Sequence, residues 1–162
     1  MGGYGTDDGF TSWLASNGYA LPVGAPTAAV LRQRGSSYID ATYGPRFVGQ
    51  PTGGFTQERA WPRTGAVAHG TAVPNDVVPE AVTSASYEAA YQEAVSSGSL
   101  TAVGSTAARV KREKVEGAVE VEYQSTFGSK TLAEDMTVVV TSIEGLLAPY
   151  LGPKLAVGAF VV

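Results

Sequence analysis

The single histidine of the chain, His69, is where proton chemistry would first be sought, because imidazole titrates near neutral pH. It stands alone in residues 66–71, a segment with the composition of a loop. The sequence contains no cysteine, which excludes disulfides and thiolate metal sites. We therefore expect His69 to be incidental, the protein not to be an enzyme, and no metal or other cofactor to be bound.

The carboxylates and the known catalytic motifs also provide no candidate active site. Asp7 and Asp8 are neighbours, but adjacent side chains on a helix point about 100° apart and do not converge on one cation. Their position favours a capping role at a helix N-terminus. The signatures of phosphate-binding loops, dinucleotide-binding folds, serine hydrolases and zinc sites are absent from the sequence.

Cationic side chains gather at one place, in a predicted strand that carries Arg109, Lys111, Arg112 and Lys114. Acidic residues nearby offset them, among them Glu113, Glu120 and Glu122. A groove for single-stranded nucleic acid combines uncompensated cations with aromatic rings, and Tyr123 is the one ring of this region. We favour a solvated, self-paired charge face here, with a nucleic-acid-binding surface as the alternative.

Residues 109–123 predict a β-hairpin whose turn has two possible lengths. A two-residue turn at 116–117 places Glu113 opposite Glu120, and like charges repel across strands. A loop one residue longer places Lys114 opposite Glu120, so we favour the longer loop. Because an isolated hairpin is marginal in water, this one must pack on its own domain or pair with another chain.

A long region without helical or strand period, residues 44–76, contains the sequence Arg59-Ala60-Trp61-Pro62-Arg63. Pro62 favours an extended Trp61, and Gly65 permits a turn after it. We interpret the segment as a structural loop anchored in the core by its tryptophan, with a binding surface as the alternative. The further anchors expected in this region are Phe47, Phe55 and Val73.

Four segments have the features of helices: 7–17, 26–43, 79–95 and 137–151. Thr6 is a suitable N-cap for the first, whereas Gly35 weakens the second and predicts a bend or break. Asp76 or a neighbour is the expected cap of the third, which has Pro79 in its first turn. The last could equally begin as a strand at 138–140, although the spacing of Ile143, Leu146 and Leu147 favours a helix.

Side-chain spacing assigns faces to the two long helices. In the second helix the inner side is predicted to comprise Val30, Leu31, Tyr38, Ile39 and Thr42. In the third it comprises Val78, Val82, Ala85 and Ala89. The residues of the third helix expected to face water are Glu80, Glu88 and Glu93.

The composition of the chain limits which folds and which partners are possible. With 162 residues, 44% of them hydrophobic, the chain can build one real core. The predicted class is mainly α (α+β): a small bundle of three to four helices with one β-hairpin, a long irregular loop and an extended C-terminal tail. A net charge of −4 disfavours tight non-specific binding to nucleic acid. Without an apolar run of membrane-spanning length or a signal-peptide pattern, we expect a soluble protein made inside a cell, with no membrane partner.

The C-terminal segment is unusually apolar for a chain end. We divide the chain into a domain of residues 1–151 and a tail of residues 152–162. The tail residues expected to dock on a partner are Leu155, Val157, Phe160, Val161 and Val162. A last strand folded onto the protein's own domain is the alternative.

Several of these segments together resemble structural proteins of tailed phages and prophages. They are 38–40, 43–44, 47–49, 58–65, 77–82, 110–115 and 119–123, and the likeness covers roughly residues 7–151. The family is often labelled DnaT-like single-stranded-DNA-binding protein, and it is similar to the head–tail adaptors of long-tailed phages. Those adaptors are helical bundles with a β-hairpin that form a twelve-membered ring beneath the portal.

The resemblance implies a structural adaptor of the virion, assembled in the host cytoplasm. Its partners would be further copies of itself, the portal protein, a stopper or tail-terminator protein, and DNA passing through without sequence-specific binding. The tail would contact the portal. Neighbouring copies would meet through helix 79–95 and the hairpin residues Arg109, Lys111, Arg112, Lys114, Glu120, Glu122 and Tyr123. The alternative is a single-stranded-DNA-binding replication protein.

Overall fold

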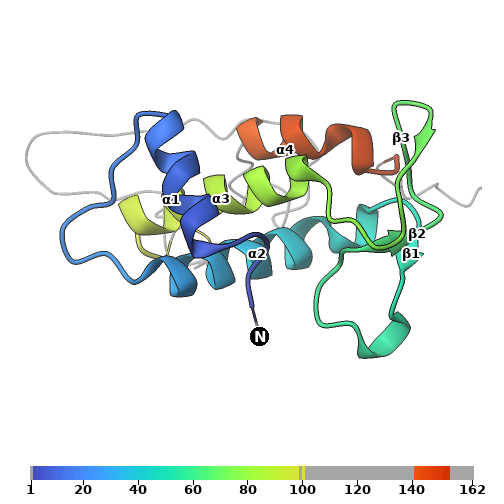
Figure 1. Ribbon diagram of the computed structural model, residues 1–162, viewed down its shortest axis with the longest axis horizontal. Coiled ribbons are helices and arrows are strands. Elements are labelled where there is room, and N and C mark those ends of the chain that lie inside the picture. The colour runs from blue at the N-terminus through green and yellow to red at the C-terminus, as the bar shows by residue number, and fades with distance from the viewer. Residues whose placement is uncertain (1, 99, 101–140, 154–162) are drawn as a thin grey trace, which may run out of the picture. The chain divides into compact units, whose positions relative to one another are not determined.

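The computed structural model describes residues 2–98, 100 and 141–153, which belong to one compact unit. The predicted hairpin 109–123, the possible strand 138–140 and the tail residues 154–162 lie outside the described residues. Those described form four α-helices and two short antiparallel strand pairs (Figure 1), so the class is mainly α with a small β component, as predicted.

The first helix, α1 (Asp7–Ser16), begins as its sequence predicts. The Thr6 side chain accepts a hydrogen bond from Gly9 N at 3.0 Å, and two aspartates occupy the first turn. Phe10 and Leu14 are buried one turn apart. Gly18, with φ +69°, lies just beyond the end of the helix in the left-handed conformation common there.

Helices α2 (Ala28–Tyr43) and α3 (Glu80–Val95) pack closely and run in opposite directions (Figure 1). Small residues permit the close approach, since the hydroxyls of Ser36 and Ser86 lie 2.7 Å apart and both side chains are fully buried. A Cβ on Gly35 would lie 2.3 Å from Ser86 O and 2.7 Å from Ala90 N. Gly35 therefore does not break α2, which is continuous from Ala28 to Tyr43, but lets α3 approach its backbone.

Three further expectations for these helices are wrong. Val30 is 39% exposed rather than inward, because buried Gly35, Ser36 and Tyr43 share the inner side with Leu31 and Ile39. Glu93 is buried rather than solvated, since its carboxylate accepts hydrogen bonds from Arg34 at 3.1 Å and from Gly98 N. Helix α3 begins after Pro79 without a side-chain cap, so Asp76 does not act as one.

The last described helix, α4 (Thr141–Leu147), continues as a 3₁₀ turn, Ala148–Tyr150, and packs on α3. Ile143 and Leu147 are fully buried. They join one apolar cluster with Val82, Ala85 and Ala89 of α3, Ile39 and Tyr43 of α2, and Trp61. A second cluster joins α1 to the other end of the two long helices through Phe10, Leu14, Leu31, Tyr87 and Ala90.

The region between α2 and α3 is more ordered than its sequence indicates. Strands β1 (Gln50–Pro51) and β2 (Arg63–Thr64) pair antiparallel, and so do β3 (Val67–Ala68) and β4 (Thr71–Ala72). His69 and Gly70 form the turn between β3 and β4, both with positive φ. Phe47 and Trp61 are buried here, but Phe55 is 101% exposed in the 3₁₀ turn Gly54–Thr56, so it is not the anchor that was predicted.

Candidate functional site

Trp61 belongs to the larger of the two apolar clusters in the described structure. Its side chain is 1% exposed. The indole meets the rings of Phe47 and Tyr150 edge to face, with both centroids 5.7 Å away. The Trp61–Pro62 peptide bond is cis. Tyr150 ends the 3₁₀ turn that follows α4. The Trp61 side chain therefore packs residues 59–63, which we call the tryptophan loop, against the C-terminal part of the described structure.

Arg63, two residues after Trp61, is buried and has no carboxylate partner in the described structure. Its guanidinium donates to four backbone carbonyls: Val48 at 2.8 Å, Ala60 at 3.0 Å, Phe47 at 3.2 Å and Gly49 at 2.6 Å. Burial lowers the pKa of Arg63 from its ordinary value. These hydrogen bonds hold residues 47–49 and residue 60 around the guanidinium, so few of its N–H groups remain to bind a ligand.

An N-terminal strap, residues 2–6, is bound to α2 and to the tryptophan loop. Tyr4 N donates to Ser36 Oγ at 2.8 Å, and the Tyr4 hydroxyl donates to Asp40 Oδ1. The same hydroxyl accepts a hydrogen bond from Trp61 N at 3.2 Å. Burial, followed by the hydrogen bond to Asp40, raises the pKa of Tyr4 far above its usual range, so the phenol stays protonated and neutral.

Arg59 completes this junction from the tryptophan loop. It donates to Gly2 O at 2.9 Å, Ser37 Oγ at 3.1 Å and Asp40 Oδ2 at 3.3 Å. Its guanidinium also lies over the Tyr4 ring, 5.9 Å from the centroid. The strap, α2 and the loop are therefore fastened through one tyrosine, one aspartate and one arginine.

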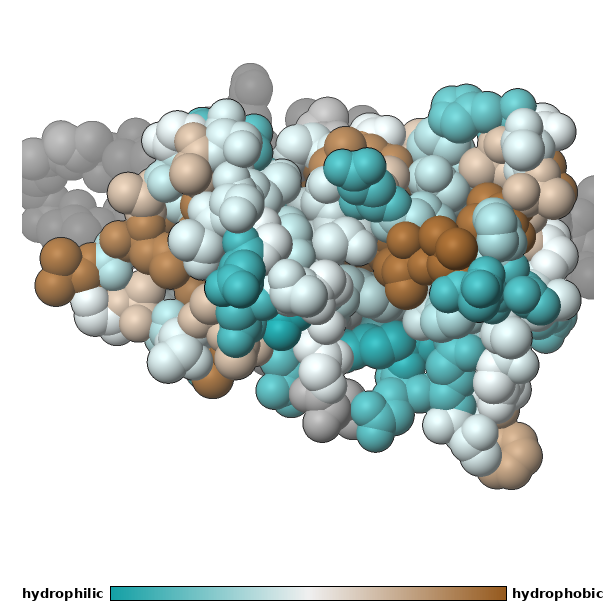
Figure 2. Space-filling model, viewed as in Figure 1, coloured by the Kyte–Doolittle hydropathy of each residue, from teal (hydrophilic) through white to brown (hydrophobic). Residues whose placement is uncertain are grey.

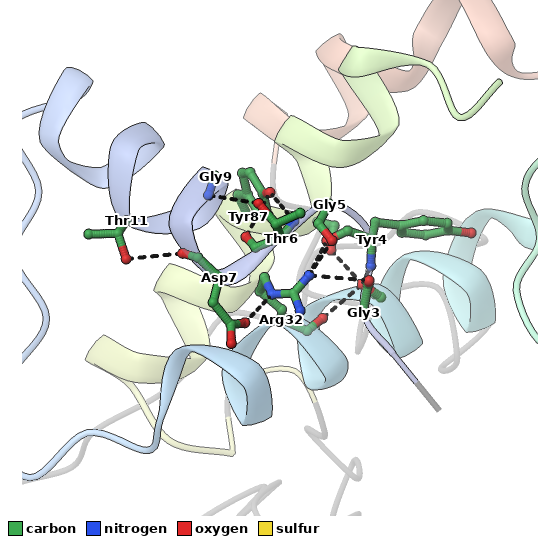
Figure 3. Close-up of polar contacts among 11 residues, drawn as sticks. Gly3, Tyr4, Gly5, Thr6, Asp7, Gly9, Thr11, Arg32 and Tyr87 are labelled. Carbon is green, nitrogen blue, oxygen red and sulfur yellow. Dashed lines mark hydrogen bonds and ion pairs between the residues drawn. The ribbon is translucent and has the colours of Figure 1, made fainter.

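Arg32 binds the strap from its other side (Figure 3). It forms an ion pair with Asp7 at 2.7 Å and donates to the carbonyls of Gly3, Tyr4 and Gly5. Tyr87 of α3 exchanges two hydrogen bonds with the Thr6 backbone. A Cβ on Gly3 would lie 2.6 Å from the Arg32 carbonyl carbon, so the strap needs glycine at that position.

Every arginine of the described residues is engaged within the protein. Besides the three above, Arg34 pairs with Glu93 at 3.1 Å and Arg46 with Glu144 at 3.5 Å. The described residues contain these five arginines and no lysine against nine aspartates and glutamates, which gives −4 (five minus nine). This part of the protein thus offers an acidic surface, with its cations used internally.

The described residues include no group of three or more His, Cys, Asp or Glu side chains that could hold a metal ion. His69 is exposed in its turn. None of the helices in this part of the chain is both long and apolar enough to cross a bilayer. What the arrangement can do is hold a loop, a strap and three helices in fixed positions.

The predicted site residues divide into two groups. Arg59, Trp61, Pro62 and Arg63 lie together, and the structure engages both arginines in backbone or side-chain contacts. The hairpin and tail residues lie outside the described residues. Sequence reasoning missed the strap and its partners Arg32, Asp40 and Tyr87, although the pattern Gly3-Tyr4-Gly5 holds a signal, an aromatic residue between two glycines that permit close packing.

Comparison with known proteins identifies a family. A protein-family model described as "Putative DnaT-like ssDNA binding protein" matches residues 3–162. No curated protein and no solved structure matches the chain. This description agrees with the DNA-binding alternative better than with the head–tail adaptor, which no comparison supports. Because the match begins at the strap and runs to the last residue, the whole chain belongs to the family of DnaT-like single-stranded-DNA-binding proteins.

Proposed function

We propose that the protein binds single-stranded DNA and does so through the basic cluster Arg109, Lys111, Arg112 and Lys114 rather than through its helical unit. The observation that carries the proposal is the family match over residues 3–162. The cluster is the densest group of cations in the sequence. Cations that neutralise phosphates supply most of the affinity of sequence-independent binding.

The described part of the protein supports this location by elimination. Its five arginines are already bound to carbonyls or carboxylates, and its balance of charge is acidic. A phosphate approaching that surface would meet carboxylates without free cations, which is unfavourable. This favours contacts to DNA from residues beyond it.

The acidic neighbours of the cluster limit the affinity. Glu113 lies among the cations, Glu120 and Glu122 follow them closely in sequence, and all three reduce the net charge that a phosphate meets. We therefore expect binding that is measurable at low salt and falls steeply as salt is added.

The experiment is a titration of a fluorescent oligonucleotide, followed by anisotropy at low and moderate salt. Lys111→Gln with Lys114→Gln should weaken binding. Lys130→Gln with Lys154→Gln removes the same charge elsewhere in the sequence and is the matched control. Equal losses in both double variants would contradict the proposed location, and no binding by the wild type at low salt would exclude the proposed function.

A structural head–tail adaptor is the second candidate. The acidic, internally paired surface of the described unit favours it, because DNA sliding through a ring must not be held by a basic wall. In this proposal about twelve copies associate head to tail in a closed ring. The ring contacts the portal through Leu155, Val157, Phe160, Val161 and Val162, and a stopper or tail terminator on its other side.

Electron microscopy of phage particles tests the adaptor directly. Particles whose copy of this protein is truncated after Lys154 should lack an ordered ring beneath the portal. An intact ring in such particles would exclude docking by the tail. Wild-type particles that contain no ring of this protein would exclude the adaptor function itself.

A further inference from the structure

Aromatic rings from α1, from α3 and from the segment between α1 and α2 lie in continuous contact. We call them the ring cluster, and it consists of Phe10, Trp13, Tyr19, Tyr87 and Tyr91. Neighbouring ring centroids lie 4.2 to 6.4 Å apart, so the rings form one connected group. Phe10 and Tyr87 are buried, Trp13 and Tyr91 are partly exposed, and Tyr19 is exposed. The cluster therefore presents aromatic groups to solvent as a unit.

Tyr19 has one ring face covered by a neighbouring ring. Its ring lies parallel to that of Tyr91, with an interplanar angle of 3° and centroids 4.2 Å apart. Trp13 meets the Tyr19 ring at 57°, so it does not lie flat on the opposite face. Because Tyr19 is nevertheless 36% exposed, its exposed ring atoms belong to the opposite face and the edge. A further flat ring can continue the stack from that side.

The surroundings of the ring cluster are neutral within an acidic unit. Residues 9–31, which carry three of its rings, are the longest run of the sequence without Asp, Glu, Lys or Arg. On α3, the carboxylates of Glu88 and Glu93 both accept hydrogen bonds within the protein. Brown and pale residues occupy the left edge of Figure 2, over the segment that joins α1 to α2. A polyanion meets less repulsion here than beside the exposed carboxylates of the unit.

We propose that the ring cluster stacks a base of single-stranded DNA, and that Tyr19 is the ring on which the base lies. This inference rests on the proposed function and adds a second site to it. Stacking of bases on aromatic side chains is a sequence-tolerant contribution to the binding of single strands. The family description names single-stranded DNA, and the matched residues 3–162 include the whole cluster.

The acidic charge of the described unit does not oppose this role. It argues against contacts to phosphates, which need cations, and those contacts remain assigned to the basic cluster of residues 109–114. A nucleobase carries no formal charge at neutral pH and stacks on a flat apolar partner instead. The two kinds of contact therefore differ in what they depend on. Phosphate contacts depend on cations and salt, whereas base contacts depend on the rings.

Fluorescence anisotropy of the full chain with two oligonucleotides tests the proposal. One is an oligothymidylate, and the other has the same number of phosphates but abasic sugars. The wild type should bind the oligothymidylate about fivefold or more tightly, as expected for one stacked base. Tyr19→Leu should lose that preference, and Tyr19→Phe, which keeps the ring, should retain it. Phe55→Leu, at a 101% exposed ring outside the cluster, is the matched control and should bind like the wild type. Circular dichroism checks that the variants are folded.

Salt dependence separates this inference from the proposed function. Tyr19→Leu should lower the affinity at each salt concentration and leave the slope unchanged, because it removes no phosphate contact. Equal binding of the two oligonucleotides by the wild type would overturn the stacking site and leave the basic cluster as proposed. So would a Tyr19→Leu variant that binds DNA normally, including one that loses self-association instead. A wild type that binds neither oligonucleotide at low salt would exclude the proposed function and this site with it.

Discussion

At the scale of single residues, Arg63 shows most clearly how this fold uses its cations. Its guanidinium ties together four carbonyls from residues 47–49 and 60. A lysine at this position keeps the charge but has a single ammonium group that cannot reach across the same set. The free energy of the loop thus depends on the shape of the guanidinium as well as on its charge.

We predict that Arg63→Lys lowers the free energy of unfolding by about 2–4 kcal/mol, because buried carbonyls lose charge-assisted hydrogen bonds. Urea denaturation followed by tryptophan fluorescence measures the change. Arg34→Lys, at an arginine whose side chain is 48% exposed, is the matched control and should change stability by less than about 0.5 kcal/mol. Equal effects of the two substitutions would show that the carbonyl contacts of Arg63 contribute nothing special.

Tyr43 makes the stability depend on alkaline pH. Burial, with smaller contributions from Tyr38 and Glu144, raises the pKa of Tyr43 to about 12, against about 10 in an unfolded chain. The folded state therefore holds this proton more tightly. The corresponding stability is fully present below about pH 10 and is lost as the pH rises towards 12, by about 2–3 kcal/mol in all.

The measurement for Tyr43 is the urea midpoint of the wild type and of Tyr43→Phe across this pH range. The variant cannot ionise at this position, so its stability should fall less steeply above about pH 10. Identical pH dependence in the two proteins would mean that Tyr43 titrates alike in the folded and unfolded states.

At the scale of elements, the crossing of α2 and α3 depends on glycine for space. In an exposed helix, Gly→Ala stabilises by up to about 1 kcal/mol. A Cβ on Gly35 would instead meet the α3 backbone at 2.3 Å, so the helices must separate. We predict that Gly35→Ala destabilises the protein by about 1–3 kcal/mol, measured by urea denaturation.

Gly145 of α4 provides the opposite case. Nothing lies within 4 Å of a Cβ built on it, so Gly145→Ala gains helix propensity without a clash. It should raise the unfolding midpoint while Gly35→Ala lowers it. If both substitutions stabilised the protein, the close approach of α2 and α3 would not constrain residue 35.

The same elements show what sequence periodicity can predict. Helix α1 follows from its capping residue and apolar spacing, and α3 follows from apolar spacing, because local rules determine them. The outward Val30, the buried Glu93 and the exposed Phe55 do not follow, because neighbours distant in sequence decide them. Glu93 is buried since Arg34 and Gly98 satisfy it, and neither partner is visible from helical spacing.

The candidate site around Trp61 could also be predicted only in part from the sequence. Trp61 beside Pro62 in a region without period indicates an anchored loop, and the structure buries its indole. The contribution of Tyr4 to that junction was not predicted, since a hydrogen bond to Asp40 across 36 positions leaves no local pattern. Long-range pairing of this kind follows from tertiary packing rather than from propensity.

At the scale of the whole molecule, charge is distributed unevenly along the chain. The described residues hold a balance of −4, equal to that of the entire chain, so the remaining residues are neutral overall despite their basic cluster. A scaffold with internally paired arginines is thus joined to a segment rich in both signs of charge. Any binding to DNA should depend on that segment and be sensitive to salt.

The most direct test of this account is the salt dependence of oligonucleotide binding. For single strands, the logarithm of the binding constant falls against the logarithm of salt concentration with a slope of about −0.7 for each phosphate neutralised. The account predicts that Lys111→Gln with Lys114→Gln makes the slope shallower by about 1.4, and that Lys130→Gln with Lys154→Gln leaves it unchanged. A slope that both double variants leave unchanged, or a wild type that does not bind, would contradict it.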